Sequence, residues 1–334
     1  MTLLIEKLVF SNASSRPLVT FALFAYNQEK YIRAAVEGAL SQTYEPLEII
    51  ISDDCSTDNT FSIAQEMVRE YNGNHNLILN KNQKNLGLVK HVNMIFSMAR
   101  GEIIVTAAGD DVSCPQRTNE IVSEFEKFPN ALAVHSNAVV IDASDADMGV
   151  MIPPIVEFNT DLISMATSNS IHIGATGAYK KKIYQLFGEI NELDVYEDLI
   201  LGFRAAVADG LIHINRPLVK YRQGVGISTK IKELSLYGKF KNRKSTIRRN
   251  ISVLKQRLRD CEPFASKLNG EIQSKIRNEL DFNILRLSLY ESPLRFLIAF
   301  LVPSDRVNLR RAIRCEADGV LRLTQKLLKY GPSR

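Results

Sequence analysis

Cysteine is scarce in this chain of 334 residues, and its placement excludes two kinds of structure. The four cysteines are Cys55, Cys114, Cys261 and Cys315, and no two of them form a Cys-x-x-Cys pair. A zinc site built on cysteine pairs and a disulfide-stapled fold are therefore not indicated. This cysteine usage is typical of proteins in a reducing cytoplasm.

A secretory signal is missing as well. Glu6 and Lys7 interrupt the apolar residues between Met1 and Phe10, and neither a basic leader nor a small-residue cleavage site follows. We therefore expect a cytoplasmic protein.

The glycine-rich loops that hold phosphates in two large classes of nucleotide-binding proteins are also lacking. Neither G-x-G-x-x-G nor G-x-x-x-x-G-K-[S/T] occurs in a suitable place, and the turn after the first predicted strand reads Phe24-Ala25-Tyr26-Asn27-Gln28-Glu29. Dinucleotide-binding and P-loop folds are therefore disfavoured. An aromatic residue at that turn can stack on a base, although such residues are at least as often packing residues.

No apolar run is long enough to cross a bilayer, which takes about 20 residues. The longest candidate, residues 294–302, is accompanied by Arg295, Arg306, Arg310, Arg311 and Arg314. A basic amphipathic segment at 294–314 is expected to bind anionic lipid headgroups on the inner face of the membrane. The alternative is a core helix or a homodimer helix.

What is present is an ordinary globular composition with an uneven charge. The chain is 45% hydrophobic and 24% charged. Residues 1–228 carry 18 Lys+Arg and 27 Asp+Glu (net −9), whereas residues 229–334 carry 24 and 10 (net +14). This split predicts an acidic folding unit joined to a basic region that meets an anionic surface, or else a solvated helical face.

Strand-like and helix-like segments alternate through the first 142 residues. The strands are expected at 19–24, 47–52, 77–80, 102–108 and 132–142, and the helices near 29–42, 58–71, 87–99 and 116–127. Apolar strands such as Ile49-Ile50-Ile51 suit a sheet that is covered on both faces. The fold class is therefore α/β, with a doubly wound, mostly parallel sheet and helices on both of its faces.

The pattern changes in the second half of the chain. Residues 143–160 predict a loop or hairpin, followed by a helix at 196–208 and two strand-like runs at 211–215 and 218–222. Beyond Thr229 the spacing of apolar residues predicts a helical C-terminal extension.

Two carboxylate pairs stand at the ends of predicted strands. Asp53 and Asp54 end the second strand, and Asp110 and Asp111 follow the fourth. Because ligands of open α/β sheets bind at the carboxyl edge, both pairs are expected to line one site. Two close like charges suit a hard cation, and Mg²⁺ or Mn²⁺ takes oxygens from carboxylates and substrate phosphates. The pairs indicate a metal-bound nucleoside diphosphate.

Each pair also has a simpler interpretation. Gly109-Asp110-Asp111 is ordinary turn chemistry. Asp53 and Asp54 can turn the chain into the helix that begins near residue 58 or cap that helix.

Together these segments resemble the family 2 glycosyltransferases. The resemblance covers roughly residues 17–228 and its motifs are specific in combination. On the nucleotide side it rests on residues 21–27, 40–44, 51–60, 85–87, 99–102 and 109–111, and on the acceptor side on residues 174–178 and 197–199.

The resemblance implies a GT-A fold, a nucleotide-sugar donor with UDP as the expected nucleotide, a Mn²⁺ or Mg²⁺ cofactor, and inversion at the anomeric carbon. It divides the chain into a lead (1–16), a catalytic domain (17–228, with halves 17–142 and 143–228) and a basic helical region (229–334). The residues it implies are Phe24, Tyr26, Asp53, Asp54, Gly87 and Asp110 for the nucleotide, Asp111 with Asp110 for the metal, Asp198 and Glu197 for catalysis, and Gly177 and Arg222 for the acceptor or phosphate side.

Asp198 is implied as the base, with Glu197 orienting it or touching the acceptor. A carboxylate within hydrogen-bond reach can take the proton of a weakly nucleophilic hydroxyl. The alternative is that both acids simply favour the dipole in the first turn of a helix. One departure from the family is the segment 221–228, which lacks the histidine that many members place after Tyr-Arg, so that Arg222 or the backbone is left for the phosphate.

The expected acceptor is a lipid-linked glycan in surface polysaccharide or O-antigen synthesis, and no nucleic-acid partner is expected. Two other functions remain open. A nucleotidylyltransferase would need an early glycine-rich basic loop, which is not seen. A non-catalytic sugar-binding or scaffold subunit would be favoured only if the base position fails.

Overall fold

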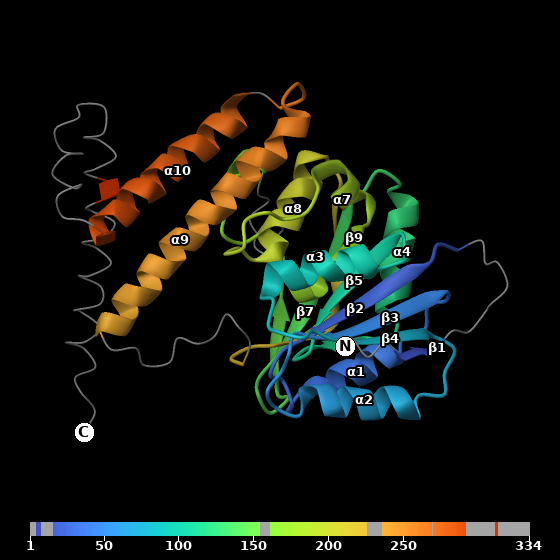
Figure 1. The fold of residues 1–334 in the computed structure, drawn as a ribbon. Helices are drawn as coiled ribbons and strands as arrows, with labels where there is room; N and C mark the ends of the chain where they lie inside the picture. The colour runs from blue at the N-terminus through green and yellow to red at the C-terminus, as the bar shows by residue number, and fades with distance from the viewer. Residues whose placement is uncertain are drawn as a thin grey trace.

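The structure of this chain, a computed structural model, describes residues 5–7, 16–153, 161–225, 236–268, 270–291 and 311–312 (Figure 1). The basic segment expected to meet a membrane, at 294–314, lies outside the described residues except for Arg311 and Ala312, and Cys315 lies outside them too. Within the described part, none of the helices has the length and apolar character to traverse a bilayer.

Four parallel strands form the centre of the sheet. They are β2 (Val19–Ala25), β3 (Leu47–Asp53), β4 (Asn76–Lys81) and β5 (Ile103–Ala108), in the order β4-β3-β2-β5. Ile49, Ile50 and Ile51 are each at most 1% exposed, because helices cover both faces of the sheet. The chain runs to opposite sides of β2 for β3 and for β5, and such a point of reversal is where open α/β sheets bind ligands.

The remaining strands make the sheet mixed. β9 (Ala178–Lys180) runs antiparallel between β5 and β7 (Ala133–Ile141), and β7 forms a hairpin with β8 (Asp147–Met151). β1 (Ile5–Lys7) and β6 (Val112–Ser113) are short antiparallel edge strands. β7 runs in the same direction as β5, since both are antiparallel to β9, so the described sheet is mostly parallel as expected, with β9, the β8 hairpin strand and the two short edge strands as the antiparallel members. β9 runs backwards because the turn before it lies at the carboxyl end of β5, where the Thr106 N–H donates to the Gly177 carbonyl (3.1 Å).

The two strand-like runs expected at 211–215 and 218–222 are one strand, β10 (Leu211–Arg222), which is parallel to β7. Its register shifts on both sides of Pro217. Proline has no N–H to donate to the ladder, so it interrupts the pairing without ending the strand.

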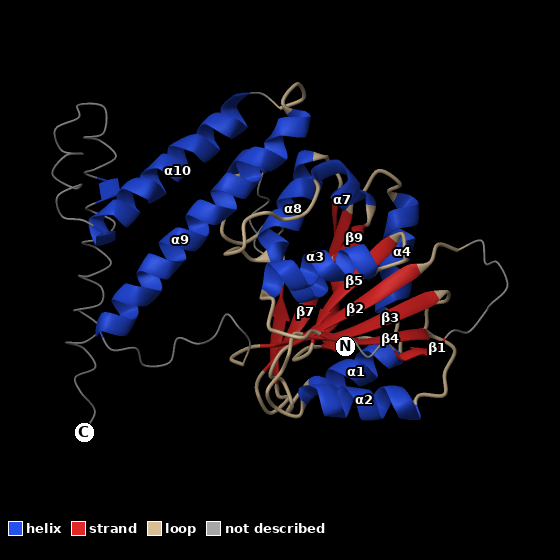
Figure 2. Cartoon of the chain, in the orientation of Figure 1, coloured by secondary structure: helices blue, strands red, loops and turns tan. Residues whose placement is uncertain are grey.

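Helices cover the two faces of the sheet, and each face has its own core (Figure 2). On one face lie α1 (Ile32–Leu40), α2 (Thr60–Glu70) and α4 (Arg117–Lys127), packed on alternate residues such as Phe21 and Ile49. On the other lie α3 (Leu88–Met98), α7 (Lys182–Phe187) and α8 (Glu197–Val207), packed on residues such as Ile50 and Ile104. Short elements at α6 (Leu162–Met165), η1 (Gly174–Thr176) and η3 (Glu262–Phe264) complete these layers.

The predicted C-terminal helices are α9 (Leu236–Cys261) and α10 (Gly270–Glu291), which lie side by side outside α8 (Figure 1). Val253 and Leu254 of α9 and Ile276 of α10 belong to the same core as α3 and α8. Ile284, farther along α10, is 47% exposed. The first part of this pair is therefore continuous with the core of the α/β layers.

Candidate active site

The predicted carboxylates of β3 and β5 gather at one edge of the sheet. The Asp54 N–H donates to the Ala25 carbonyl and the Gly109 N–H to the Phe24 carbonyl, each at 2.8 Å, so both turns are held against the end of β2. A Cβ at Gly109 would lie 2.4 Å from Gln28 Oε1, the end of a flexible side chain, and 3.1 Å from Ala25 Cβ, so this turn approaches the end of β2 closely. The topology thus brings the two aspartate pairs together, as the spacing of the strands predicted.

Asp53 is the pair member that shapes the turn. Its Oδ2 accepts the Ser56 N–H (2.9 Å), its Oδ1 accepts the Ser56 hydroxyl, and the residue is 1% exposed. Burial raises the pKa of its carboxyl, against the effect of these hydrogen bonds. The simpler interpretation, a turn into the following helix, therefore describes what the Asp53 side chain does in this structure.

Asp54 joins the β3 end to the loop that precedes α3. Its Oδ1 accepts hydrogen bonds from Asn82 Nδ2 (2.8 Å) and the Leu86 N–H (2.9 Å), and its Oδ2 accepts the Gly87 N–H (3.0 Å). Gly87 has φ 77°, a left-handed conformation that favours glycine. The contact with the nucleotide that the resemblance implied for Asp54 stays a prediction, and the carboxylate is observed to hold this loop in position.

The aromatic residues at the end of β2 differ in exposure. Phe24 is partly buried, with its ring edge-on to the His91 ring at 5.2 Å between centroids. Tyr26 is 40% exposed at the turn that follows. Tyr26 is therefore the more accessible of the two rings for stacking on a base.

Asp110 and Asp111 form a buried, strongly acidic turn. Asp111 Oδ1 accepts the Arg222 N–H at 2.7 Å, and both aspartates are less than 8% exposed. Burial, and then the neighbouring Asp110, raise the pKa of Asp111 to about 8. Burial also raises the pKa of Asp110. Two close carboxyls that cannot both ionise cheaply are suited to a divalent cation, which would remove the repulsion.

The Arg222 side chain links this acidic turn to the turn that follows β7. Its Nε donates to the Asp110 carbonyl (3.0 Å), Nη1 to the Asp142 carbonyl (2.9 Å) and Nη2 to Asp145 Oδ1 (2.6 Å). The guanidinium also lies over the Tyr31 ring, 4.5 Å from its centroid. With its side chain 1% exposed, Arg222 is placed to fix the Asp110–Asp111 backbone, and a direct contact with phosphate stays a prediction.

The acceptor-side turn is bonded to β5. The single hydroxyl hydrogen of Thr106 Oγ1 is shared between the carbonyls of Gly174 (2.8 Å) and Gly177 (2.9 Å). Arg117, fully buried, donates through Nη2 to the carbonyls of Thr106 (2.8 Å) and Gly177 (3.1 Å). Arg117 and Thr106 were not predicted as site residues. Nothing in the local sequence marks an arginine at the start of a helix as buried, because its partners lie on two other elements.

Asp198 and Glu197 stand at the start of α8, against the same turn. Asp198 Oδ2 accepts the Gly174 N–H (3.2 Å) and Oδ1 accepts the Leu199 N–H (2.7 Å). Burial is the main reason that the pKa of Asp198 rises to about 6; burial, and then Asp198, raise the pKa of Glu197 to about 8. Near neutral pH the pair therefore shares a proton, which Glu197 holds more strongly than Asp198 does. That is a suitable pairing for taking a proton from a hydroxyl.

Gly174 leaves room for the Glu197 carboxyl, which gives a first prediction. A Cβ at Gly174 would lie 2.5 Å from Glu197 Oε1 and 3.5 Å from Asp198 Cβ. We expect Gly174→Ala to push the flexible Glu197 side chain aside and to lower turnover about tenfold, with little loss of stability. The measurement is turnover beside a thermal melt. Gly270→Ala is the matched control, since nothing lies within 4 Å of a Cβ there, and equal turnover of the two variants would contradict the assigned role.

A metal at this edge would depend on few protein ligands. Among the described residues, no group of three or more His, Cys, Asp or Glu side chains could hold a metal ion. Mg²⁺ and Mn²⁺ sites of one or two carboxylates completed by substrate phosphates are common. The buried, repelling pair of Asp111 and Asp110 fits such a site. The protein ligand that would replace the absent histidine is not evident among the described residues.

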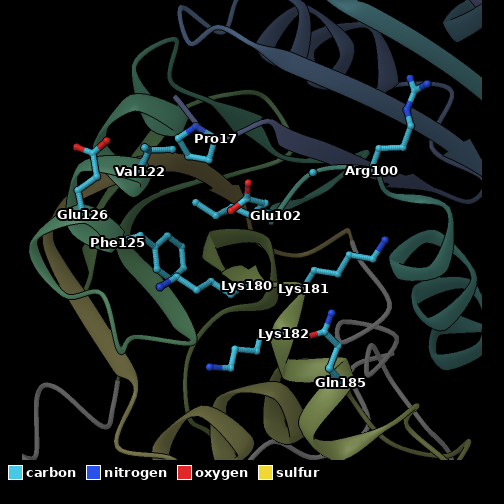
Figure 3. A pocket seen from close by; sticks show the side chains of 12 residues that line it. Pro17, Arg100, Glu102, Val122, Phe125, Glu126, Lys180, Lys181, Lys182 and Gln185 are labelled. Carbon is cyan, nitrogen blue, oxygen red and sulfur yellow. The ribbon is translucent and has the colours of Figure 1, made fainter. Parts of the chain in front are cut away.

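A separate cavity of about 450 Å³ lies at the opposite end of β5 (Figure 3). Arg100, Glu102, Phe125, Lys180 and Lys182 are among its lining residues. Lys180 Nζ donates to the Pro129 carbonyl (2.5 Å). Because Glu102 stands just before the first residue of β5 and the aspartates follow its last, this cavity is not part of the carboxylate site.

Comparison with known proteins agrees with this geometry. The family described as Glycosyl transferase family 2 matches residues 20–187. EpsE of Bacillus subtilis (strain 168) is 33% identical over 144 residues, which are 43% of this chain and 51% of EpsE. A chondroitin synthase of Escherichia coli is 35% identical over 137 residues, 41% of this chain and 19% of the synthase. The matches therefore span about half of EpsE and less of the synthase.

Solved structures share the fold at low identity. The structure of Staphylococcus aureus TarS 1–349 in complex with UDP-GlcNAc matches this chain with a TM-score of 0.56 at 17% identity. The match covers 88% of this chain and 79% of the TarS chain. The structure of the mannosyltransferase PcManGT of Pyrobaculum calidifontis in complex with GDP-Man and Mn²⁺ matches with a TM-score of 0.53 at 17% identity. This match covers 96% of this chain and 82% of the PcManGT chain. The fold is the expected GT-A fold. Since the family match covers 168 of the 334 residues, counted from 20 through 187, this chain is a member of the family 2 glycosyltransferases.

Proposed function

We propose that this chain is an inverting, metal-dependent glycosyltransferase that moves a sugar from a nucleotide-sugar donor to a hydroxyl acceptor. One observation carries the proposal. The turn at 174–177 is hydrogen-bonded to Thr106 of β5 on one side and to Asp198 on the other. It thereby joins the strand that ends in the Asp110–Asp111 turn to the candidate base.

The proposed reaction is a single displacement. The acceptor oxygen forms a bond to the anomeric carbon while the bond from that carbon to the donor phosphate breaks, and the nucleoside diphosphate leaves with the bonding electrons. The acceptor proton passes to the Asp198 carboxylate. Attack opposite the leaving group inverts the anomeric centre. Glu197, which burial and Asp198 make the weaker acid of the pair by raising its pKa, would donate a hydrogen bond to the acceptor or to Asp198.

Asp111, with Asp110, would hold the cation. A cation bound there would neutralise the negative charge that develops on the leaving diphosphate. Arg222 keeps these two carboxylates in place through the Asp110 carbonyl and the Asp111 side chain. At the far end of the site, Tyr26 and the loop that Asp54 positions are proposed to receive the nucleotide, with Gly87 and Phe24 beside them.

UDP is the nucleotide we propose, supported by the TarS complex with UDP-GlcNAc. The acceptor we propose is a glycan, lipid-linked and part of a surface polysaccharide. It is supported by the chondroitin synthase similarity and by the charge of residues 229–334. Contact of residues 294–314 with an anionic membrane, or a homodimer through the C-terminal helices, belongs to the same proposal.

A ligand-binding experiment tests the donor site. We expect UDP-sugars with Mn²⁺ at about 100 times Kd to stabilise the protein by about 2.7 kcal/mol, which is a rise in Tm on the order of 5 °C. EDTA should abolish most of that rise, because the diphosphate then meets the acidic turn without a cation. The measurement is a thermal-shift panel of UDP-sugars, GDP-sugars and nucleoside triphosphates, each with and without metal.

The same panel separates the competing functions. Stabilisation by triphosphates with no sugar transfer would favour a nucleotidylyltransferase, and donor binding without turnover would favour a scaffold subunit. A UDP-sugar response that is unchanged by EDTA would remove Asp111 as a metal ligand.

A further inference from the structure

Arg257, on the C-terminal helix α9, is a fully buried cation that reaches into the layer below. Its Nη1 donates to the carbonyls of Met165 (3.1 Å), Ala166 (3.2 Å) and Ser168 (2.8 Å), and its Nη2 donates to the Leu199 carbonyl (3.1 Å). Leu199 follows the candidate base directly. Arg257 therefore ties α9 to the first turn of α8.

Burying the positive charge of Arg257 costs free energy that nearby negative groups must offset. Burial lowers the pKa of Arg257 to about 10, against the attraction of Asp260 and Asp198. Asp260 Oδ1 already accepts hydrogen bonds from Arg204 (3.1 Å) and Gln256 (3.0 Å). Asp198 is therefore a second negative group that compensates Arg257, and the attraction acts equally on both partners.

We propose that Arg257 is a positioning residue for the base: it fixes the start of α8 through the Leu199 carbonyl, and its charge favours the ionised form of Asp198. This inference rests on the proposed function, in which Asp198 accepts the acceptor proton. It makes α9 a structural part of the active site, although Arg257 and Asp198 are 59 residues apart along the chain (257 − 198).

The groups that face Asp198 determine the sign of the effect. Glu197 lies beside it on α8, the Gly174 and Leu199 N–H groups donate to it, and Tyr179 of β9 lies close enough for its hydroxyl to interact with both acids. Of these groups and Arg257, only the Arg257 guanidinium is positively charged, so it is the one whose charge favours the ionised form of Asp198. Without it, burial remains and opposes ionisation, so the pKa of Asp198 rises and less of the base is ionised at neutral pH.

Two variants of Arg257 separate its charge from its hydrogen bonds. Arg257→Gln removes the charge and keeps a donor; we expect the acid limb of kcat/KM against pH to move up by about one unit, with the KM for donor within about twofold. Arg257→Lys keeps the charge but loses the planar fork; we expect its acid limb to stay in place while kcat falls about tenfold.

Arg204→Gln is the matched control. Arg204 is equally buried and donates to the Gly188 and Glu189 carbonyls and to Asp260 Oδ1, and it lies in the last turn of α8, at the opposite end from Asp198. We expect its Tm to fall as that of Arg257→Gln does, with no movement of the acid limb. If Arg257→Gln does not fold, the Lys variant decides, because a kcat equal to that of the unmodified protein would overturn the inference.

Asp198→Asn, assayed in parallel, separates a failure of the proposed function from a failure of the role proposed for Arg257. If that variant keeps full turnover, the proposed base is wrong and the function has to be reassigned. If Asp198→Asn is inactive while Arg257→Gln keeps the acid limb of the unmodified protein, the proposed function stands and the role of Arg257 is refuted.

Discussion

Replacing Asp198 by asparagine is expected to lower sugar transfer about 10³-fold, the range that general base catalysis contributes, while donor binding persists. The amide cannot take a proton from the acceptor hydroxyl, but its one oxygen can still accept one of the two N–H groups, that of Gly174 or that of Leu199, which place this side chain. The measurement is kcat with a saturating nucleotide sugar, beside the donor-induced rise in Tm.

The pH profile of the unmodified enzyme has a defined direction. The pKa of Asp198 is raised to about 6, so the base is protonated below that value and kcat/KM should rise as pH increases through about 6. Glu197→Gln should change turnover at pH 7 by only a few fold, because Glu197, with a pKa raised to about 8, is already protonated there. A loss as large as that of Asp198→Asn would reverse the two assignments.

A control for general damage is Asp194→Asn. Asp194 lies four residues before Asp198 and has a half-exposed side chain paired with Arg249. Exposed ion pairs contribute little to stability, so near-normal turnover is expected. Asp198→Asn activity at the level of this control would rule out the proposed base.

Asp111→Asn is expected to abolish the response to Mn²⁺ and to lower transfer by about 10³-fold, because the site then lacks the carboxylate that we propose as the metal ligand. The amide oxygen can still accept the Arg222 N–H, so the turn should keep its shape. The measurement is Mn²⁺ binding by calorimetry in the presence of nucleoside diphosphate. Asp147→Asn, in the exposed β8 hairpin, should bind metal normally.

Stability gives an independent check on the same variant. The pKa of Asp111 in the folded protein is raised to about 8, above its value in the unfolded chain. Folding is therefore favoured while this group is protonated, and that contribution is lost as pH rises through about 8. In the absence of metal, Asp111→Asn should be more stable than the unmodified protein above pH 8. A lower Tm there would contradict the repulsion we assign to Asp110 and Asp111.

The sheet and its helices were predictable because local patterns decide them. The strand expected at 47–52 is β3 (Leu47–Asp53), and the helix expected near 116–127 is α4 (Arg117–Lys127). A continuous apolar run such as Ile49-Ile50-Ile51 is stable only in a sheet covered on both faces. The convergence of Asp53, Asp54 and the Asp110–Asp111 turn followed, since the ends of parallel strands share an edge.

The work of individual side chains was not predictable, because their partners lie far away along the chain. Asp54 bonds to a loop more than 25 residues later. Arg222 bonds to the Asp110 carbonyl 112 residues earlier. From the sequence, Asp54 and Arg222 were both expected to contact the ligand. In the structure, both side chains hydrogen-bond to backbone groups that they hold in position. Likewise, the pairing of β9 between β5 and β7 has no local signal.

The sequence by itself determined the α/β alternation, the carboxylates at the strand ends and the family, because periodicity and short motifs depend on neighbouring residues. The tertiary structure alone decided which carboxyls are ionised and which cations support them. The burial of Asp111, Glu197 and Asp198 depends on elements distant in the chain, as do the Arg222 and Arg257 charges that favour ionisation of Asp111 and Asp198. Arg117 and Arg257 look like ordinary surface residues of their helices until folding removes them from water and leaves mainly backbone carbonyls as their partners.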